Sequence, residues 1–469
     1  MLLDFQTAGC LHSQPMANLE TTPTQSHVAS TRGSFRRIPA MALAICTIAL
    51  GSRFFLFVHR YAVNVFFWDQ WDFLDGFFHN QAGLVRLFLW QHGPHREGIG
   101  LIADKYLYAW SHWNERVDSF VIGGCVIAAT ALALVLKRRV FGSFAVSDIA
   151  IPAIFLTLGQ YETLIGTPNL AYSGLPLLMI VLYCLSLLQR NVTARYGAVL
   201  VLNFLLIYTG FGIFMGVVTV GLFALELYWS FRSRTAVPLA LAFAALLIAV
   251  ISLASFFIRY VWAPAVDCFE LPRHRLWLYP WFMSLMFARF LGLKEGIGPP
   301  TMVGLVLLLG ALAILVAHVA HLVKHGPAPA PLLGAVLLGY SLLFSANAAL
   351  GRVCLGLPEA ARSSRYVTLM IPAFLGIYLY LLSWKASHRN LVFALLVPWL
   401  LIAAVPTTHW FADGKRAWAE CYKKIGDIHA CDSIAKFPIY PRPEATGLQQ
   451  KLDFLQQHHL NLFANPHAK

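Results

Sequence analysis

Charged side chains are scarce in this chain. Asp, Glu, Lys and Arg make up 12% of its 469 residues, about half the share that soluble domains carry. Hydrophobic residues reach 58%, and the mean hydropathy is +0.64. This composition excludes a soluble enzyme of the same length and predicts that most of the chain lies in a lipid bilayer.

Carboxylates are the scarcer charge, with 22 Asp and Glu against 35 Lys and Arg and a net charge of +13. The basic excess does not predict a nucleic-acid partner, because much of it lies in short loops between apolar runs. Lys and Arg in such loops retain them in the cytoplasm and face anionic membrane lipids. The loops, which contain no carboxylate, are 137–139, 190–195, 232–234, 324–325 and 385–389.

Long apolar runs are abundant. A membrane span needs about 20 apolar residues, and that rule predicts an all-α, polytopic transmembrane bundle of about eleven spans. The shorter run 280–293 is interpreted as an interfacial or re-entrant helix. The predicted spans lie near 39–58, 119–136, 147–160, 173–189, 196–210, 213–230, 236–258, 301–323, 331–348, 366–384 and 391–408.

Three parts of the chain follow from these spans. Residues 1–38 are predicted to be a disordered cytoplasmic N-terminus, 39–408 the transmembrane domain, and 409–469 a small external tail. With the N-terminus inside, all five basic loops fall in the cytoplasm. The acidic segments then fall outside, above all the long first loop 59–118, whose aromatic pattern predicts surface helices. In a bacterium this describes the cytoplasmic (inner) membrane with a periplasmic site.

Cysteine is infrequent, with eight residues. Four of them fall in outside segments, where disulfides are permitted in a periplasm. Cys421 and Cys431 are the favoured pair, and free thiols are the alternative because spacing alone cannot establish a bridge. The remaining outside cysteines are Cys268 and Cys354.

The first outside loop begins with two carboxylates three residues apart, Asp69 and Asp72, between Trp68 and Trp71. On a helix they share a face and can act on one substrate. They are therefore the candidate catalytic residues, as a general base and its partner acting through a hydrogen bond, water or a divalent ion. The alternative is a helix cap with ordinary interfacial charges between anchoring Trp side chains.

A second polar segment follows in the same loop. Gly93 and Pro94 argue against a regular helix there, and no further Cys or His completes a metal-binding set. We expect this segment to bind an anionic group of a substrate, or else to pair its charges internally. Its candidate binding residues are His92, His95, Arg96 and Glu97.

Basic residues also gather before the tenth predicted span, although outside loops usually contain few of them. Guanidinium groups form paired hydrogen bonds to phosphate oxygens, which predicts a lipid-phosphate site rather than simple interface anchoring. The candidate residues here are Arg352, Arg362, Arg365 and Tyr366. Tyr161 and Glu162, in another outside segment, are further candidates for binding a polar acceptor.

The chain resembles the GT-C integral-membrane glycosyltransferases. The resemblance is carried by Trp68-Asp69-Gln70-Trp71-Asp72, by His92 with His95-Arg96, and by Ser364-Arg365-Tyr366 before a span. It implies a sugar donor carried on a polyprenyl phosphate, with Asp69 as catalytic base or acceptor-orienting group. It also implies that Arg362 and Arg365 hold the lipid phosphate. The motif Trp-Trp-Asp-Tyr-Gly of oligosaccharyltransferases is absent.

These patterns predict a membrane glycosyltransferase that moves a sugar to an external glycan or lipid acceptor. A transporter or flippase for a lipid-linked glycan is the first alternative, because it would also need outside Arg residues at headgroup level. A non-enzymatic subunit of a cell-envelope assembly is the second.

Overall fold

A computed structural model of the chain describes residues 37–78, 82–232, 237–262, 266, 268–271, 275–293, 298–403, 409–444 and 446–464. Regular structure within these ranges is helical, apart from an antiparallel pair of two-residue strands, β1 (Gln91–His92) and β2 (His95–Arg96). The predicted all-α class is confirmed. Residues 1–36 of the predicted N-terminal segment lie outside the described residues.

Among the described residues, six helices are long and apolar enough to cross a membrane, which supports a helical membrane protein as the composition predicts. They are α2 (Arg37–Tyr61), α7 (Glu115–Phe141), α11 (Ile213–Phe231), α14 (Gly298–His325), α15 (Pro329–Arg352) and α17 (Ala386–Ala403). Residues 404–408, the end of the last predicted span, lie outside the described ranges.

The other five predicted spans fall on shorter apolar helices, so the total of eleven crossings stays a prediction. They are α8 (Ala150–Phe155) with short helical turns at both ends, α9 (Gly174–Leu187), α10 (Val192–Ile207), α12 (Leu239–Ser255) and α16 (Arg365–Leu381). The segment 280–293 forms most of α13 (Leu278–Phe290), which is buried over residues 284–290 and packs against α14, α15 and α16.

Local signals place the ends of these helices. The Asn114 side chain accepts a hydrogen bond from the Arg116 N–H, 3.1 Å away, and so caps the start of α7. The same helix ends at Gly142, whose φ of 82° suits glycine. Arg138 and Arg139 occupy its last turn, where the helix dipole favours positive charge.

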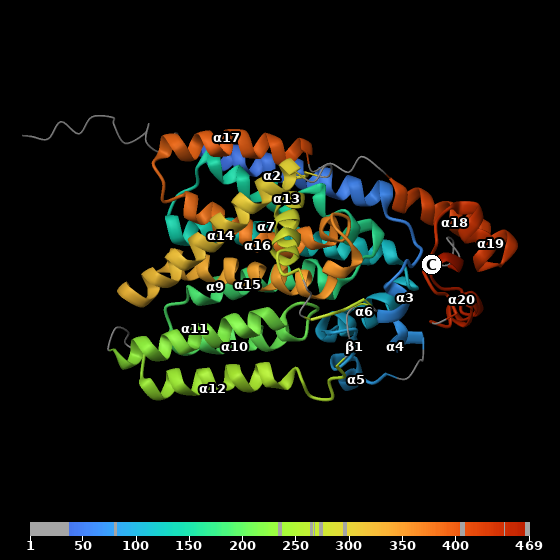
Figure 1. Ribbon diagram of the computed structural model, residues 1–469, viewed down its shortest axis with the longest axis horizontal. Helices are drawn as coiled ribbons and strands as arrows, with labels where there is room; N and C mark the ends of the chain where they lie inside the picture. The colour runs from blue at the N-terminus through green and yellow to red at the C-terminus, as the bar shows by residue number, and fades with distance from the viewer. Residues whose placement is uncertain are drawn as a thin grey trace, which may run out of the picture.

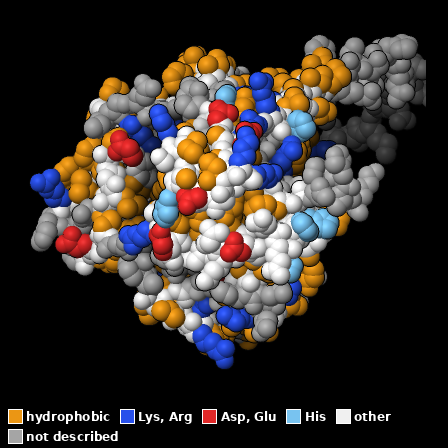
Figure 2. All heavy atoms as spheres, turned by 90° about the vertical axis from the view of Figure 1, so that its right-hand side faces the viewer, with side chains coloured by type: hydrophobic (Ala, Val, Ile, Leu, Met, Phe, Trp, Pro, Cys, Tyr) orange, Lys and Arg blue, Asp and Glu red, His pale blue; other side chains and the backbone are white. Residues whose placement is uncertain are grey.

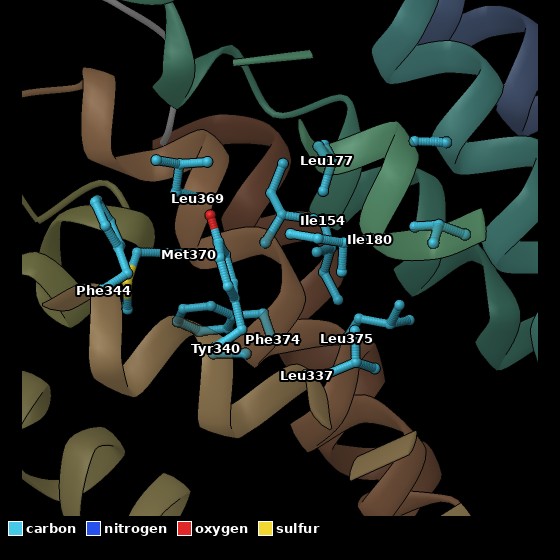
Figure 3. Close-up of a cluster of buried hydrophobic side chains, with 14 of the residues drawn as sticks. Ile154, Leu177, Ile180, Leu337, Tyr340, Phe344, Leu369, Met370, Phe374 and Leu375 are labelled. Atoms are coloured by element: carbon cyan, nitrogen blue, oxygen red, sulfur yellow. The ribbon is translucent and has the colours of Figure 1, made fainter. Parts of the chain in front are cut away.

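The long helices lie side by side, and the short helices of the first loop and the C-terminal helices gather at one end of them (Figure 1). We call this end the site end. The bundle interior beneath it is apolar, with α8, α9, α15 and α16 contributing to one buried cluster (Figure 3). Its members include Ile154, Leu177, Ile180, Leu337, Tyr340, Phe344, Met370, Phe374 and Leu375.

The C-terminal segment is helical and packs on the first loop. It comprises α18 (Trp410–Ile425), α19 (Ile428–Ala435), α20 (Leu448–Gln457) and a turn at Asn461–Phe463. Trp418, Phe437 and Leu452 share one buried cluster with Phe67 and Trp71 of the first loop. The predicted surface helices of that loop are short: α3 (Gln70–Phe73), α4 (Asp75–Phe78), α5 (Leu84–Phe88) and α6 (Gly98–Ser111).

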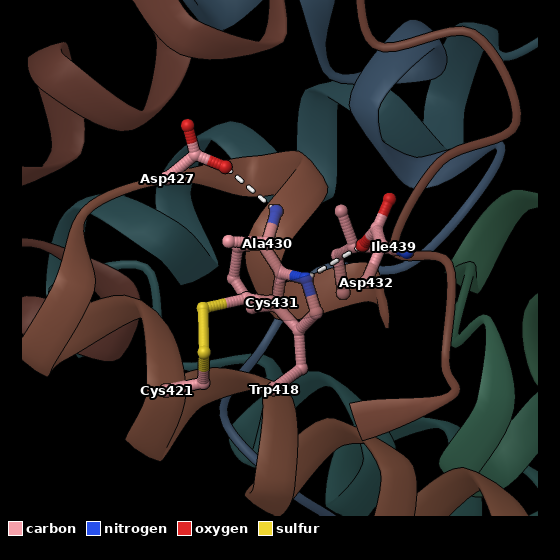
Figure 4. Close-up of a disulfide and its surroundings, with 7 residues drawn as sticks. All are labelled: Trp418, Cys421, Asp427, Ala430, Cys431, Asp432 and Ile439. Carbon is pink, nitrogen blue, oxygen red and sulfur yellow. Dashed lines mark hydrogen bonds between the residues drawn. A yellow bond between two sulfur atoms is a disulfide. The ribbon is translucent and has the colours of Figure 1, made fainter. Parts of the chain in front are cut away.

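Two disulfides form within the described ranges, and both use cysteines that the sequence places outside. Cys421–Cys431, the favoured pair, joins α18 to α19 (Figure 4). Cys268–Cys354 ties the segment before α13 to the residues just after α15. Of the cysteines in the described ranges, Cys46, Cys125 and Cys184 carry free thiols.

Candidate functional site

Acidic, basic and histidine side chains lie together across the site end of the bundle (Figure 2). A pocket of about 260 Å³ opens among them. Its wall brings together the first loop, the segment before α9, the α10–α11 turn and the start of α16. The lining residues include Asp69, Asp72, Phe73, His92, His95, Thr163, Asn169, Tyr172, Phe211, Arg352, Arg365 and Tyr366.

An ion pair between Asp69 and Arg365 forms part of this wall. The Arg365 Nη1 atom lies 3.1 Å from Asp69 Oδ2 and donates a hydrogen bond to it. The two side chains are 41% and 29% exposed, so a ligand in the pocket can reach both charges. The sequence predicted both residues, and the fold brings them together across almost 300 positions of chain.

The backbone before α3 aims Asp69 into the pocket. Trp68 has a φ of 52°, a left-handed conformation that is unusual for a bulky residue. Its N–H donates to the Ile439 carbonyl, 2.9 Å away, in the segment between α19 and α20. Ile439 in turn donates from its N–H to Asp432 Oδ1 at 3.0 Å (Figure 4). The C-terminal segment therefore helps to hold the turn that presents Asp69.

Arg365 is held from behind by Glu162. Its Nε atom lies 3.3 Å from Glu162 Oε1, and it donates a hydrogen bond to Ser363 Oγ at 3.0 Å. Ser363 Oγ donates to Glu162 Oε2 at 2.7 Å, and the Arg365 backbone N–H donates to the same oxygen at 3.3 Å. A carboxylate at the start of α16 also suits the positive end of the helix dipole. Glu162 therefore positions Arg365 and does not itself line the pocket.

These charges fix the protonation of the pair. Burial alone would raise the pKa of the Asp69 carboxyl, but the electrostatic interactions with Arg365, His92 and Arg352 outweigh it and hold that pKa below its ordinary value. Burial works against the Arg365 cation, yet Glu162 and Asp69 raise its pKa above the ordinary value. Both groups are therefore charged at neutral pH.

A second guanidinium, that of Arg352, lines the same pocket as the Asp69–Arg365 ion pair. Arg352, the last residue of α15, donates from Nη1 to the Tyr366 hydroxyl at 3.1 Å, and its guanidinium carbon lies 5.7 Å from that ring's centre. Arg352 and Arg365 thus line one pocket from two helices. Arg362 was also predicted to hold phosphate, but it lies in a helical turn before α16 and outside the pocket lining.

The His92–Glu97 segment is a tight hairpin, and it contains no regular helix, as Gly93 and Pro94 predict. His95 packs against the rings of Tyr172 and Phe211, with ring centres 5.6 and 4.2 Å away. Burial, with the nearby Arg352 charge, lowers the pKa of His95 well below its ordinary value. The imidazole is therefore neutral at pH 7, where it can donate or accept a hydrogen bond.

Glu97 lies one layer behind the pocket. It is buried, accepts a hydrogen bond from Asn169 Nδ2 at 3.3 Å, and has one oxygen 3.8 Å from His92 Nδ1. Burial raises the pKa of its carboxyl. Glu97 itself does not line the pocket, but it contacts His92 and Asn169, which both do.

Arg96 points away from the pocket. Its buried guanidinium donates to the carbonyls of Phe256, Leu89 and Ile258, with Nη2 2.9 Å from the Phe256 oxygen. These contacts fasten the hairpin to the residues that follow α12. We therefore assign Arg96 to anchoring this loop, in place of the predicted binding of an anionic group.

Asp72 faces both the pocket and the C-terminal segment. Its two oxygens accept hydrogen bonds from the Tyr440 and Thr446 hydroxyls, each 2.7 Å away. Next to it, Lys451 donates to the Trp71 carbonyl at 2.6 Å. The carboxylate that the sequence presents as a catalytic partner is therefore already engaged by the segment between α19 and α20.

Tyr161 and Arg289 lie on the far side of Glu162. The Arg289 guanidinium carbon is 5.7 Å from the centre of the Tyr161 ring, and neither residue lines the pocket. Sequence reasoning missed Thr163, Phe73 and Phe211 as lining residues. Phe211 had one signal, its place between Gly210 and Gly212 in a tight turn at the site end.

In the described part of the chain, no three His, Cys, Asp or Glu side chains come together as metal ligands. Fold and site together define a helical membrane protein with a charged pocket at one end of its bundle. Comparisons with protein family models, curated proteins and solved structures found no match.

Proposed function

We propose that this protein is a membrane glycosyltransferase of GT-C-like architecture, which moves one sugar from a polyprenyl-phosphate donor to an external glycan or lipid acceptor. One observation carries the proposal: a carboxylate and a guanidinium, Asp69 and Arg365, meet at 3.1 Å on the wall of a ligand-sized pocket. Transfer from a sugar phosphate needs both, a group that accepts the hydroxyl proton and a cation that receives the leaving phosphate.

The proposed reaction is a displacement at the sugar's anomeric carbon. The acceptor oxygen forms a bond to that carbon while the bond from the carbon to the phosphate oxygen breaks. Asp69 takes the hydroxyl proton, and the phosphate leaves with the bonding electron pair. Arg365 and Arg352 stabilise the negative charge that grows on it.

The ion pair itself would couple donor binding to activation of Asp69. A carboxylate whose pKa is lowered is a weak base. When a donor phosphate shares the Arg365 guanidinium, part of the attraction on Asp69 is withdrawn and its pKa rises towards the ordinary value. The base would therefore strengthen only when a donor is bound.

The remaining lining residues suit a sugar. A volume of about 260 Å³ lies just below the usual range of about 300–1,000 Å³ for ligand pockets, which fits a single ring. Asn169, Thr163 and neutral His95 offer hydrogen bonds to hydroxyls, and Tyr172 and Phe211 offer apolar faces. Asp72 would assist through its hydrogen-bonded carboxylate, and no step here is assigned to a divalent ion.

The apolar interior favours the enzyme over a transporter or flippase. Alternating access needs polar groups along the bundle, but Leu337, Tyr340 and Phe374 are buried in the hydrophobic cluster that α15 and α16 help to form (Figure 3). We further propose eleven crossings of a bacterial cytoplasmic membrane, with a cytoplasmic N-terminus and a periplasmic site. The five short helices supply the crossings beyond the six long ones.

Titration of the purified protein with undecaprenyl phosphate tests this proposal. Wild type should bind, Arg365→Ala should lose most of the affinity, and Asp69→Asn should retain it or bind more tightly, because the competitor for Arg365 is gone. Arg86→Ala, an exposed arginine on α5, is the matched control and should bind as wild type does. Folded wild type that does not bind, or equal binding by Arg365→Ala, would overturn the proposal.

A further inference from the structure

A second cavity of about 290 Å³ lies at the opposite end of the bundle from the charged pocket. It is formed by the end of α9, the start of α10, the end of α11 and the start of α15. Leu332 near the start of α15 lines it, whereas Arg352 at the other end of that helix lines the charged pocket. The rise of an α-helix puts about 30 Å between the two. The cavity is therefore a separate site.

The wall of this cavity is apolar except for one ion pair and the Tyr196 hydroxyl, which interacts with both members of the pair. Arg195 Nη2 lies 3.6 Å from Glu226 Oε1, which is beyond hydrogen-bond distance. The side chains are 24% and 10% exposed, so the carboxylate is largely withdrawn from solvent. The apolar and aromatic lining comprises Leu187, Val192, Tyr196, Val199, Leu222 and Phe223, with Leu332 opposite.

A neighbouring ion pair at the same end shows the contrast. Lys137 Nζ lies 2.7 Å from Asp148 Oδ2, with both side chains almost fully buried. Asp148 also accepts from the Ala145 N–H at 2.9 Å and from the Tyr378 hydroxyl. The charges of Lys137 and Asp148 are therefore paired with each other and hydrogen-bonded within the protein, whereas Arg195 and Glu226 line a cavity.

We infer that this cavity binds a phospholipid whose headgroup carries a primary ammonium beside its phosphate. The ammonium would donate to Glu226, and the phosphate would accept from Arg195. A headgroup that carries only a phosphate would bind Arg195 and offer no cation to Glu226. A headgroup that carries only a positive charge would bind Glu226 and offer no anion to Arg195. The apolar wall takes the hydrocarbon next to the headgroup. This end of the bundle also carries Arg190 and Arg232, as expected at headgroup level.

Titration of the full-length protein in detergent with short-chain phosphatidylethanolamine and phosphatidylglycerol tests the inference, with binding measured by native mass spectrometry. The ethanolamine lipid should bind at least tenfold more tightly. Glu226→Gln should abolish this preference, and Arg195→Gln should weaken both lipids about tenfold, which corresponds to about 1.4 kcal/mol. Arg190→Gln, exposed and outside the lining, should behave as wild type.

Equal binding of the two lipids by wild type would overturn the inference, as would an unchanged preference in Glu226→Gln. Should that variant not fold, Glu226→Asp keeps the charge with a shorter reach and should reduce the preference without abolishing it. Undecaprenyl phosphate binding by Glu226→Gln should equal that of wild type. The proposal of a lipid site and the proposal of a transferase site are therefore tested independently of each other.

Discussion

The buried pair Lys415–Glu115 should control whether the C-terminal helices stay attached to the first loop. Lys415 Nζ lies 2.7 Å from Glu115 Oε1, and the two side chains are 0% and 1% exposed. Glu115 also accepts a hydrogen bond from the Val65 N–H at 3.1 Å. Lys415→Met would remove the only charge within hydrogen-bond reach of this carboxylate in the described residues, and leave a buried charge without compensation.

Breaking such a pair on one side costs about 3–5 kcal/mol. Because Glu115 can then recover part of this by taking up a proton, we expect about 3 kcal/mol of lost unfolding free energy. The double variant Lys415→Met with Glu115→Gln should lose clearly less, since Gln keeps an acceptor for Val65 and carries no charge. Lys423→Met, exposed on the same helix, should change stability by under about 0.5 kcal/mol.

Denaturant or thermal unfolding in detergent, followed by circular dichroism and by protease cleavage after residue 409, measures these values. The expected order of stability is wild type and Lys423→Met, then the double variant, then Lys415→Met. A loss below about 1 kcal/mol in Lys415→Met, or a double variant less stable than the single one, would refute the reasoning.

Three further outcomes are expected. Arg352→Gln should weaken undecaprenyl phosphate binding about tenfold and Arg362→Gln much less, because of these two residues Arg352 alone lines the pocket. Equal losses of affinity in a binding titration would contradict this placement. Replacing Cys421 and Cys431 by Ser should lower the unfolding free energy by about 2–3 kcal/mol in melting experiments, and an unchanged melting temperature would count against the bridge. His95 has a folded pKa well below 6.5, so the unfolded chain binds the extra proton and stability should fall as pH drops below about 6.5. His95→Gln should flatten that slope in melts between pH 5 and 7, and an identical slope would contradict it.

Much of the fold was predictable because a bilayer imposes a simple rule. Backbone groups in lipid must pair internally, so each long apolar run had to become a helix. In the described part of the chain, each of the eleven predicted spans overlaps an apolar helix. Gly93 and Pro94 likewise predicted that no regular helix forms between His92 and Glu97, but not the hairpin that forms there. The lengths of α8 and α16 were less predictable, since tertiary packing decides where such helices end.

The sequence predicted which charged residues belong to the candidate site, but not which groups each of them contacts. Charged side chains in an otherwise apolar chain single out Asp69, Arg352 and Arg365, which do line one pocket. Arg96 is also a charged residue in the same loop, yet its guanidinium donates to three backbone carbonyls, two of them in the remote segment after α12. Only the three-dimensional fold distinguishes these uses, because the deciding contacts span long stretches of sequence. The engagement of Asp72 by Tyr440 depends on the docking of the C-terminal helices in the same way.

Sugar transfer itself is the most direct test of the proposed function. Proteoliposomes holding the full chain would receive a panel of radiolabelled undecaprenyl-phosphate hexoses and pentoses, together with an envelope extract as the source of acceptors. Label should move from one donor to an acceptor with wild type. It should not move with Asp69→Asn, although that variant binds the donor. Full transfer by Asp69→Asn, or no transfer from any donor that wild type binds, would contradict the account.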